Sequence, residues 1–175
     1  LPQAAALSAD GSDAAAHAIM TTDTVKKEIA VSLTIGGKEV RLGAIAKGSG
    51  MIHPNLATML VFLTTDCAIS APMLHAALTG DVSDTFNMVS VDGDTSTNDM
   101  VAVLANGLAG NTEITAPGAD FTAFCRALNS VTVWLCRQIA GDGEGATRLL
   151  ECCVTGAKGH GAAKTVAKSI ICSSL

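Results

Sequence analysis

The sequence predicts a mixed α/β protein in which helices pack in layers against β-sheet. Three observations carry this prediction: two alternating segments joined by Gly36-Gly37, an apolar run over Met59–Leu63, and a helical repeat across residues 121–139. Apolar residues at every second position indicate strands, and apolar residues at steps of three and four indicate helices. Strands interleaved with amphipathic helices are typical of layered α/β or α+β folds.

The composition indicates one domain with a large core. Of the 175 residues, 49% are hydrophobic and only 15% are charged, against an average of about 25% charged. The chain has no Lys or Arg between Lys47 and Arg126, no Tyr and a single Trp. A nucleic-acid groove needs clustered cations and stacking aromatic side chains, so this class of partner is excluded.

Hydropathy and cysteine usage predict a cytoplasmic protein. The longest apolar runs fall far short of the roughly 20 residues that a membrane-spanning helix needs, so we expect no membrane insertion. The six cysteines form no CxxC pair and lie in apolar surroundings. This pattern favours reduced, buried thiols over a disulfide framework.

The first half of the chain is predicted to contain a helix and three strands. Residues 12–20 begin with Ser and are rich in Ala, which indicates a short helix. Residues 28–35 and 38–46 alternate around the two glycines and predict a hairpin. The apolar run from Thr58 to about Cys67 predicts a strand that is buried on both faces.

The second half alternates helices and strands. Residues 121–139 give the clearest helix, because Phe121, Phe124, Leu128 and Leu135 recur at helical spacing. The other expected segments are a helix over 70–78, a strand over 86–91, a helix from 97 or 98 to 107, a strand over 147–155 and a helix over 162–174.

No metal site is predicted. Asp92, Asp94 and Ser96 copy the start of a calcium loop, but Thr97 and Val103 stand where that loop needs Gly and Glu. The four histidines never come within four residues of one another. The chain also lacks the third glycine of GxGxxG after Gly48 and Gly50, and it has no GxxxxGK[ST] segment.

Thr58 allows two interpretations. It follows a loop of Gly, Pro and Asn and precedes the apolar run, so it is either the first residue of a buried strand or the first residue of a new polypeptide. A cut between Ala57 and Thr58 would give Thr58 a free α-amine with an unperturbed pKa of about 7.7–8.0. That amine would serve as a built-in base for the Thr58 hydroxyl. These residues alone leave both interpretations open.

Four further segments stand out along the chain: KGSGMIHPNLATML followed by TTD, AIMTTDT at 18–24, VDGDTSTND at 91–99 and GDGEGAT at 141–147. Together they resemble the ornithine acetyltransferases, the glutamate N-acetyltransferases of arginine biosynthesis. The resemblance implies a self-processing, N-terminal-nucleophile fold with β-sheets packed between helices. It also implies cleavage between Ala57 and Thr58, so that residues 1–57 end an α chain and residues 58–175 begin a β chain of one structural unit.

The resemblance further implies the roles of individual residues. Thr58 would be the nucleophile and, through its amine, the general base; Thr21, Lys47 and Glu144 would contact substrate. Acetyl would pass from N2-acetyl-L-ornithine to L-glutamate through an acetyl-threonine. No cofactor is implied, the use of acetyl-CoA as a donor stays open, and the α and β chains are expected to assemble into a hetero-oligomer of αβ units.

The match also has departures and gaps. Lys26 stands where the family often has Pro, and the family's oxyanion Thr-Gly pair and its C-terminal Asn and Ser/Thr are not in this chain. We therefore expect these 175 residues alone to be an incomplete enzyme. Three alternatives stay open: an N-terminal-nucleophile amidohydrolase or aminopeptidase, a magnesium-dependent phosphatase with Asp92 as nucleophile, and a structural domain without catalysis.

Overall fold

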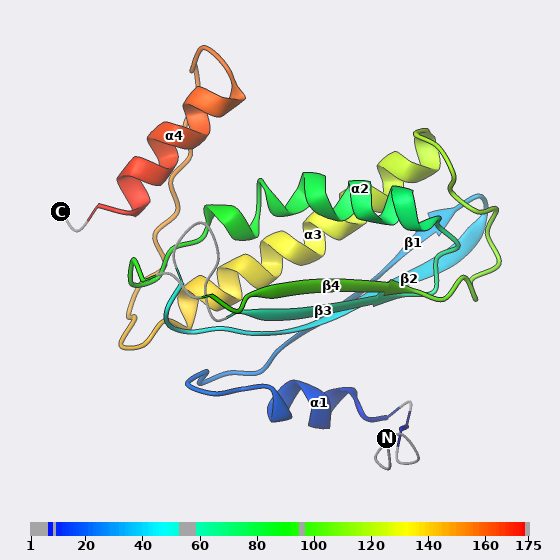
Figure 1. The fold of residues 1–175 in the computed structure, drawn as a ribbon, viewed down its shortest axis with the longest axis horizontal. Helices are drawn as coiled ribbons and strands as arrows, with labels where there is room; N and C mark the ends of the chain where they lie inside the picture. The colour runs from blue at the N-terminus through cyan, green and yellow to red at the C-terminus, as the bar shows by residue number, and fades with distance from the viewer. Residues whose placement is uncertain (1–6, 9, 53–58, 95–96, 174–175) are drawn as a thin grey trace.

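The structure, a computed structural model, describes residues 7–8, 10–52, 59–94 and 97–173 (Figure 1). The predicted junction of Ala57 and Thr58 lies outside these ranges. The elements, in chain order, are α1 (Ser12–Ala18), β1 (Lys27–Ile35), β2 (Lys38–Lys47), β3 (Leu60–Thr65), α2 (Ala71–Val82), the 3-10 helix η2 (Phe86–Met88), β4 (Met100–Ala105), α3 (Ala119–Gly141) and α4 (His160–Ile171).

The predicted hairpin is confirmed. Strands β1 and β2 pair antiparallel, from Lys27 opposite Ala46 to Ile35 opposite Lys38. Gly36 and Gly37 have φ angles of +55° and +75°. A two-residue turn with positive φ at both positions matches the right-handed twist of the strands, and glycine adopts it without steric cost.

The four strands form one sheet in the order β1-β2-β3-β4. Strand β3 pairs antiparallel with β2 and parallel with β4. Parallel neighbours need a crossover connection, and α2 lies within the segment that provides it. The register sets Lys47 opposite Leu60 and Leu60 opposite Met100, so one end of each of these three strands lies at the same edge of the sheet.

Helix α3 forms the main layer over the sheet. It packs on β1 and β2, and α2 packs on α3; Figure 1 shows both helices on one side of the sheet and α1 on the other. Leu128 and Leu135 of α3 are fully buried, and burying such a side chain contributes about 1.5–3 kcal/mol. The helical repeat predicted from the sequence is therefore the face that forms the core, and the mixed α/β class is confirmed.

Strand β3 corrects one prediction. Val61, Leu63 and Thr65 are buried, whereas Phe62 is half-buried and Thr64 is exposed. The expectation of burial on both faces is wrong because, within the described residues, α2 and α3 cover only one side of the sheet. A second sheet, which the family resemblance implies, is not among the described residues.

The helix expected from Thr97 or Asn98 to Gly107 is also wrong. Residues 100–105 form β4, which pairs with β3 at every position from Leu60–Met100 to Thr65–Ala105. A short apolar run such as MVAVLA fits either a helix or a strand, and here pairing with β3 decides for the strand.

Two predicted strands are absent from the described ladders. Residues 86–88 form the 3-10 helix η2, and residues 147–155 lie outside every described strand. The other helices are confirmed with shifted ends: α2 continues to Val82 rather than Leu78, α3 spans 119–141 and α4 spans 160–171. Ser12 begins α1 but does not cap it, since Gly11 occupies that position.

Candidate active site

Lys47 ends β2 and lies at the edge where β3 and β4 begin. Its side chain is only 4% exposed, so it is not an ordinary surface lysine. Lys47 Nζ donates to Thr21 Oγ1 at 2.8 Å. Two residues that the family resemblance places in the substrate site are thus in direct contact, although they belong to segments 26 positions apart.

A buried cluster of three charged residues, Asp23, Lys27 and Asp142, adjoins this contact. Lys27 is fully buried, and its Nζ lies 2.8 Å from Asp23 Oδ1 and 2.6 Å from Asp142 Oδ2. Thr24 donates to the same Asp142 carboxylate from its backbone N–H, at 3.0 Å to Oδ2, and from its hydroxyl. Because a buried charge is costly unless it is paired and hydrogen-bonded, these contacts fix all three side chains in place.

Asp23 connects this cluster to the backbone at Thr21 and Gly48. Its Oδ1 accepts the N–H of Gly48 at 2.6 Å, and its Oδ2 accepts the N–H of Thr21 at 3.2 Å. Burial opposes ionisation of Asp23, but the hydrogen bonds from Gly48 and Lys27 outweigh it and lower the pKa of this carboxyl. Asp23 is therefore an ionised carboxylate that holds the backbone of Thr21 close to that of Gly48.

A pocket of about 320 Å³ opens at this place. Four of the described residues that line it carry charge: the Lys47 ammonium and the carboxylates of Asp92, Asp94 and Glu144. The other described lining residues are Thr21, Thr22, Gly50 and Met51. One cation beside several carboxylates suits a ligand that carries both a carboxylate and an ammonium group.

Asp92 holds the loop that forms one wall of this pocket. Its oxygens accept the backbone N–H groups of Met51, of Ile52 at 3.0 Å and of Asp94 at 3.1 Å. Burial opposes ionisation, yet these N–H donors lower the pKa of Asp92. A carboxylate held by three backbone donors is a poor candidate for the nucleophile of a phosphatase, which weakens that alternative.

Glu144 reaches the pocket from the turn after α3. Its backbone N–H donates to the Ser49 carbonyl at 3.0 Å. Its carboxylate lies near Gly50, where an added methyl group would stand 3.6 Å from Glu144 Oε1. The Glu144 side chain is exposed to the pocket. Thr21, Lys47 and Glu144 thus surround one pocket, while Ala57 and Thr58 lie outside the described residues.

Sequence reasoning missed the buried cluster of Asp23, Lys27 and Asp142. A signal was present, because Asp23 lies within AIMTTDT and Asp142 within GDGEGAT, two of the segments that carry the family resemblance. Nothing in the sequence showed that Lys27 would turn inward, since a lysine near the start of a strand is usually exposed.

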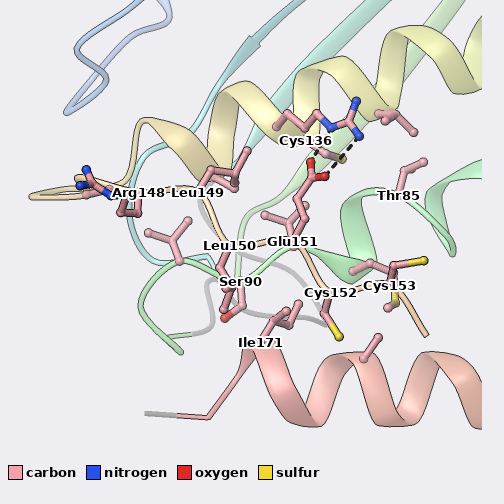
Figure 2. A pocket seen from close by; sticks show the side chains of 18 of the residues that line it. Thr85, Ser90, Cys136, Arg148, Leu149, Leu150, Glu151, Cys152, Cys153 and Ile171 are labelled. Carbon is pink, nitrogen blue, oxygen red and sulfur yellow. Dashed lines mark hydrogen bonds and ion pairs between the residues drawn. The ribbon is translucent and has the colours of Figure 1, made fainter. Parts of the chain in front are cut away.

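A larger cavity of about 620 Å³ lies between α3, η2, α4 and the segment around residues 148–153 (Figure 2). On its wall, Arg137 Nε donates to Glu151 Oε1 at 2.5 Å. Burial raises the pKa of the Cys136 thiol that lines it. Of the predicted site residues that the structure describes (Thr21, Lys47 and Glu144), only Glu144 lines this cavity, whereas all three line the smaller pocket.

The described part of the chain holds neither a metal cluster nor a membrane span. Within it, no group of three or more His, Cys, Asp or Glu side chains is arranged to hold a metal ion. None of its helices combines the length and apolar character needed to cross a bilayer.

A family model describes the whole chain. The model of the ArgJ family matches residues 1–175. The chain belongs to the ArgJ family. This membership confirms the resemblance drawn from the four sequence segments.

Individual ArgJ proteins are similar to this chain over nearly its whole length. The arginine biosynthesis bifunctional protein ArgJ of Symbiobacterium thermophilum is 55% identical over 172 residues, which cover 98% of this chain and 43% of that protein. The protein of the same name from Geobacillus stearothermophilus is 56% identical over 158 residues, covering 90% of this chain and 38% of the relative. The chain therefore spans about two fifths of the length of these relatives.

The fold is that of a solved ArgJ structure. A crystal structure of arginine biosynthesis bifunctional protein argJ from Bacillus halodurans superposes with a TM-score of 0.61 at 47% identity. The match covers 65% of this chain and 53% of that chain. The mixed α/β arrangement is thus shared with an ArgJ protein of known structure.

Proposed function

We propose that the full-length protein carrying this sequence is a glutamate N-acetyltransferase that moves acetyl from N2-acetyl-L-ornithine to L-glutamate. The observation that carries the proposal is the pocket that joins Thr21, Lys47 and Glu144. The Lys47 ammonium pairs with the α-carboxylate of the substrate, and the Glu144 carboxylate pairs with the δ-ammonium of acetylornithine. Charge-assisted hydrogen bonds of this kind are strong and directional.

The first chemical step of the proposal is self-cleavage. The Thr58 hydroxyl attacks the Ala57 carbonyl carbon, the peptide C–N bond breaks, and the nitrogen takes up the hydroxyl proton to become a free α-amine. Water then hydrolyses the Ala57 ester, which leaves a carboxylate on Ala57 and restores the Thr58 hydroxyl. Residues 1–57 then end one chain and residues 58–175 begin another.

Acetyl transfer follows as two attacks on a carbonyl carbon. The Thr58 hydroxyl, its proton taken by the Thr58 amine, attacks the acetyl group; the amide C–N bond breaks, and ornithine leaves with that proton on its α-amine. The neutral α-amine of glutamate then attacks the acetyl-threonine, the ester C–O bond breaks, and the proton that the amine loses passes through the Thr58 amine to the leaving Thr58 oxygen, which restores the hydroxyl. An amine at the same residue as its hydroxyl gains the rate advantage of fixed proximity.

Pairing of β2 with β3 supports the idea that both products stay together. Six residue pairs, from Leu42–Thr65 to Lys47–Leu60, join the segment before the junction to the segment after it. A cut between them removes none of these pairs. We accordingly propose one structural unit made of an α and a β chain, and assembly of these αβ units into a hetero-oligomer. The proposed reaction uses no bound cofactor, and acetyl-CoA is a candidate second acetyl donor.

Two measurements test the proposal. Intact mass under denaturing conditions should give two fragments that part at Ala57-Thr58, and a Thr58→Ala variant should give one uncut chain. Product analysis with N2-acetylornithine should then show acetylglutamate when glutamate is present. Free acetate as the main product would assign the protein instead to the amidohydrolases, and an uncut wild-type chain would refute the mechanism.

A further inference from the structure

Met51 lines the candidate pocket in a backbone conformation that residues with side chains rarely adopt. Its φ angle is +55°, and it is the one described residue other than glycine with a positive φ. In this left-handed region the Cβ of an L-amino acid comes too close to the following carbonyl oxygen, a cost that glycine does not have. Such strain persists only where the surroundings enforce it, and it is concentrated at ligand sites and active sites.

The contacts that enforce this conformation come from Asp92. The Met51 side chain is half exposed, so its burial does not account for the strain. Asp92 Oδ2 accepts the Met51 N–H, and Asp92 Oδ1 accepts the Ile52 N–H at 3.0 Å. Successive N–H groups converge on one anion in this way where the chain makes a turn of this kind. The Val91 N–H also donates to the Ile52 carbonyl at 2.6 Å, which joins the two segments a third time.

The loop that Asp92 holds also carries Glu144. The Glu144 N–H donates to the Ser49 carbonyl at 3.0 Å. A methyl group on Gly50 would stand 3.6 Å from Asp92 Oδ2 and 3.6 Å from Glu144 Oε1, so the two carboxylates lie on either side of this glycine. Because Ser49 is only two residues before Met51, a change of conformation at Met51 would move the peptide groups to which Glu144 is attached.

We propose that Asp92 is a positioning residue of the proposed reaction, which holds Met51 in its left-handed conformation and thereby sets the place of Glu144 beside the substrate. This inference rests on the proposed function. The oxygens of Asp92 accept three backbone N–H groups, those of Met51, Ile52 and Asp94. Asp92 thus acts on the loop, while Glu144 binds the ammonium group of the ligand.

Asp92→Asn should weaken substrate binding more than it slows the chemistry. An asparagine has a single acceptor oxygen, so it cannot accept the Met51 N–H on one atom and the Ile52 N–H on the other. An interaction that serves the ground state and the transition state equally raises KM when it is lost and leaves kcat unchanged. We expect KM for N2-acetylornithine to rise about tenfold, which corresponds to about 1.4 kcal/mol, with little change in kcat.

A second substitution separates the backbone conformation of Met51 from its side chain. Met51→Gly and Met51→Ala both remove the side chain beyond Cβ, but only glycine adopts a positive φ without strain. In the Asp92→Asn protein, Met51→Gly should lower the raised KM about threefold, which is half of the lost free energy. Met51→Ala should leave the raised KM where it is.

Asp66→Asn in the full-length protein is the matched control. Asp66 Oδ1 also accepts a strand N–H, that of Arg41 at 2.7 Å, but Asp66 follows β3 at the end of the strand away from Lys47. Its substitution should leave KM unchanged. An Asp92→Asn protein that is folded, cut and active with the KM of the wild type would overturn the role of Asp92 and leave the proposed function intact. Equal recovery by Met51→Gly and Met51→Ala would also overturn it.

Melting temperatures give a readout that needs no activity and no folded Asp92→Asn protein. With Asp92 present, Met51→Gly should melt at a higher temperature than Met51→Ala, because alanine keeps the strain at a positive φ. The reverse order would overturn the inference. A wild-type protein that transfers no acetyl would refute the proposed function, and the effect on KM with it, whereas the order of the two melting temperatures decides by itself whether Met51 is held in a strained conformation.

Discussion

Lys27 Nζ lies 2.6 Å from Asp142 Oδ2, although 115 positions of sequence separate the two residues. This contact joins the start of β1 to the turn after α3, and Glu144 follows Asp142 by two residues. The ion pair therefore positions a pocket residue through a buried contact between two side chains that are not among the described lining of the pocket.

Replacing Lys27 by methionine should destabilise the fold strongly. The change leaves the buried carboxylates of Asp23 and Asp142 without their cation, and breaking a buried ion pair by removing one partner costs about 3–5 kcal/mol. The neighbouring Lys26 offers a matched control, because its pairs with Asp13 and Glu28 are partly solvated and such pairs are worth about 0–1 kcal/mol. Urea unfolding measures both variants; equal losses in Lys27→Met and Lys26→Met would contradict the buried role.

The same cluster predicts a loss of stability in acid. The pKa of Asp23 and that of Asp142 are both lowered, because hydrogen bonds from Gly48, Lys27 and Thr24 outweigh burial. A carboxyl whose folded pKa lies below its unfolded value of about 3.9 stabilises the fold above that value and loses this contribution as the pH falls through the folded pKa. The free energy of unfolding should therefore decrease below about pH 5.

An Asp142→Asn variant isolates one of these two groups. Its unfolding free energy should fall less steeply with acid than that of the wild type, because one fewer depressed carboxyl must be protonated. Denaturant titrations at a series of pH values between neutral and acid give both curves. Parallel curves would show that the Asp142 carboxylate does not contribute in this way.

Glu144→Gln should reduce the preference of the enzyme for a substrate that carries a δ-ammonium group over one that lacks it. Hydrogen bonds to charged groups contribute about 1.5–3 kcal/mol, so KM for N2-acetylornithine should rise roughly 10- to 100-fold. N2-acetylnorvaline has the same carbon chain without the δ-ammonium and should respond little to the change. If KM rises equally for both compounds, Glu144 does not bind that ammonium group.

Two glycines near the pocket should respond differently to alanine. A methyl group on Gly143 would meet Val91 Cγ1 at 2.7 Å, which a stiff β-branched side chain cannot relieve, so Gly143→Ala should cost about 1–3 kcal/mol of stability. A methyl on Gly50 would meet Asp92 and Glu144 at an ordinary 3.6 Å. Gly50→Ala should therefore keep the melting temperature and raise KM by narrowing the pocket; a reversed pattern would contradict the described packing.

Local patterns predicted most of the fold. The hairpin was readable because Gly36-Gly37 interrupts two alternating segments, and α3 was readable because its apolar residues keep helical spacing over many turns. Strand β4 could not be predicted, because its six apolar residues have no periodicity that distinguishes a strand from a helix. Its strand conformation depends on pairing with β3. The exposed face of β3 was missed for a related reason, since burial of the second face depends on what packs there.

The candidate site was predicted in part. The family resemblance gave Thr21, Lys47 and Glu144, and the structure brings these three around one pocket. The residues that hold them could not be read from the sequence, because Asp23, Lys27 and Asp142 act through contacts between distant segments.

The pairing of β2 with β3 changes the molecularity of unfolding once the chain is cut. An intact chain unfolds in a unimolecular step, so its melting temperature does not depend on protein concentration. Two chains that share a sheet must dissociate as they unfold, and mass action then makes the melting temperature rise with concentration. A backbone break between Lys47 and Leu60 would therefore turn a folding equilibrium into an assembly equilibrium, with every residue pair of the sheet still in place.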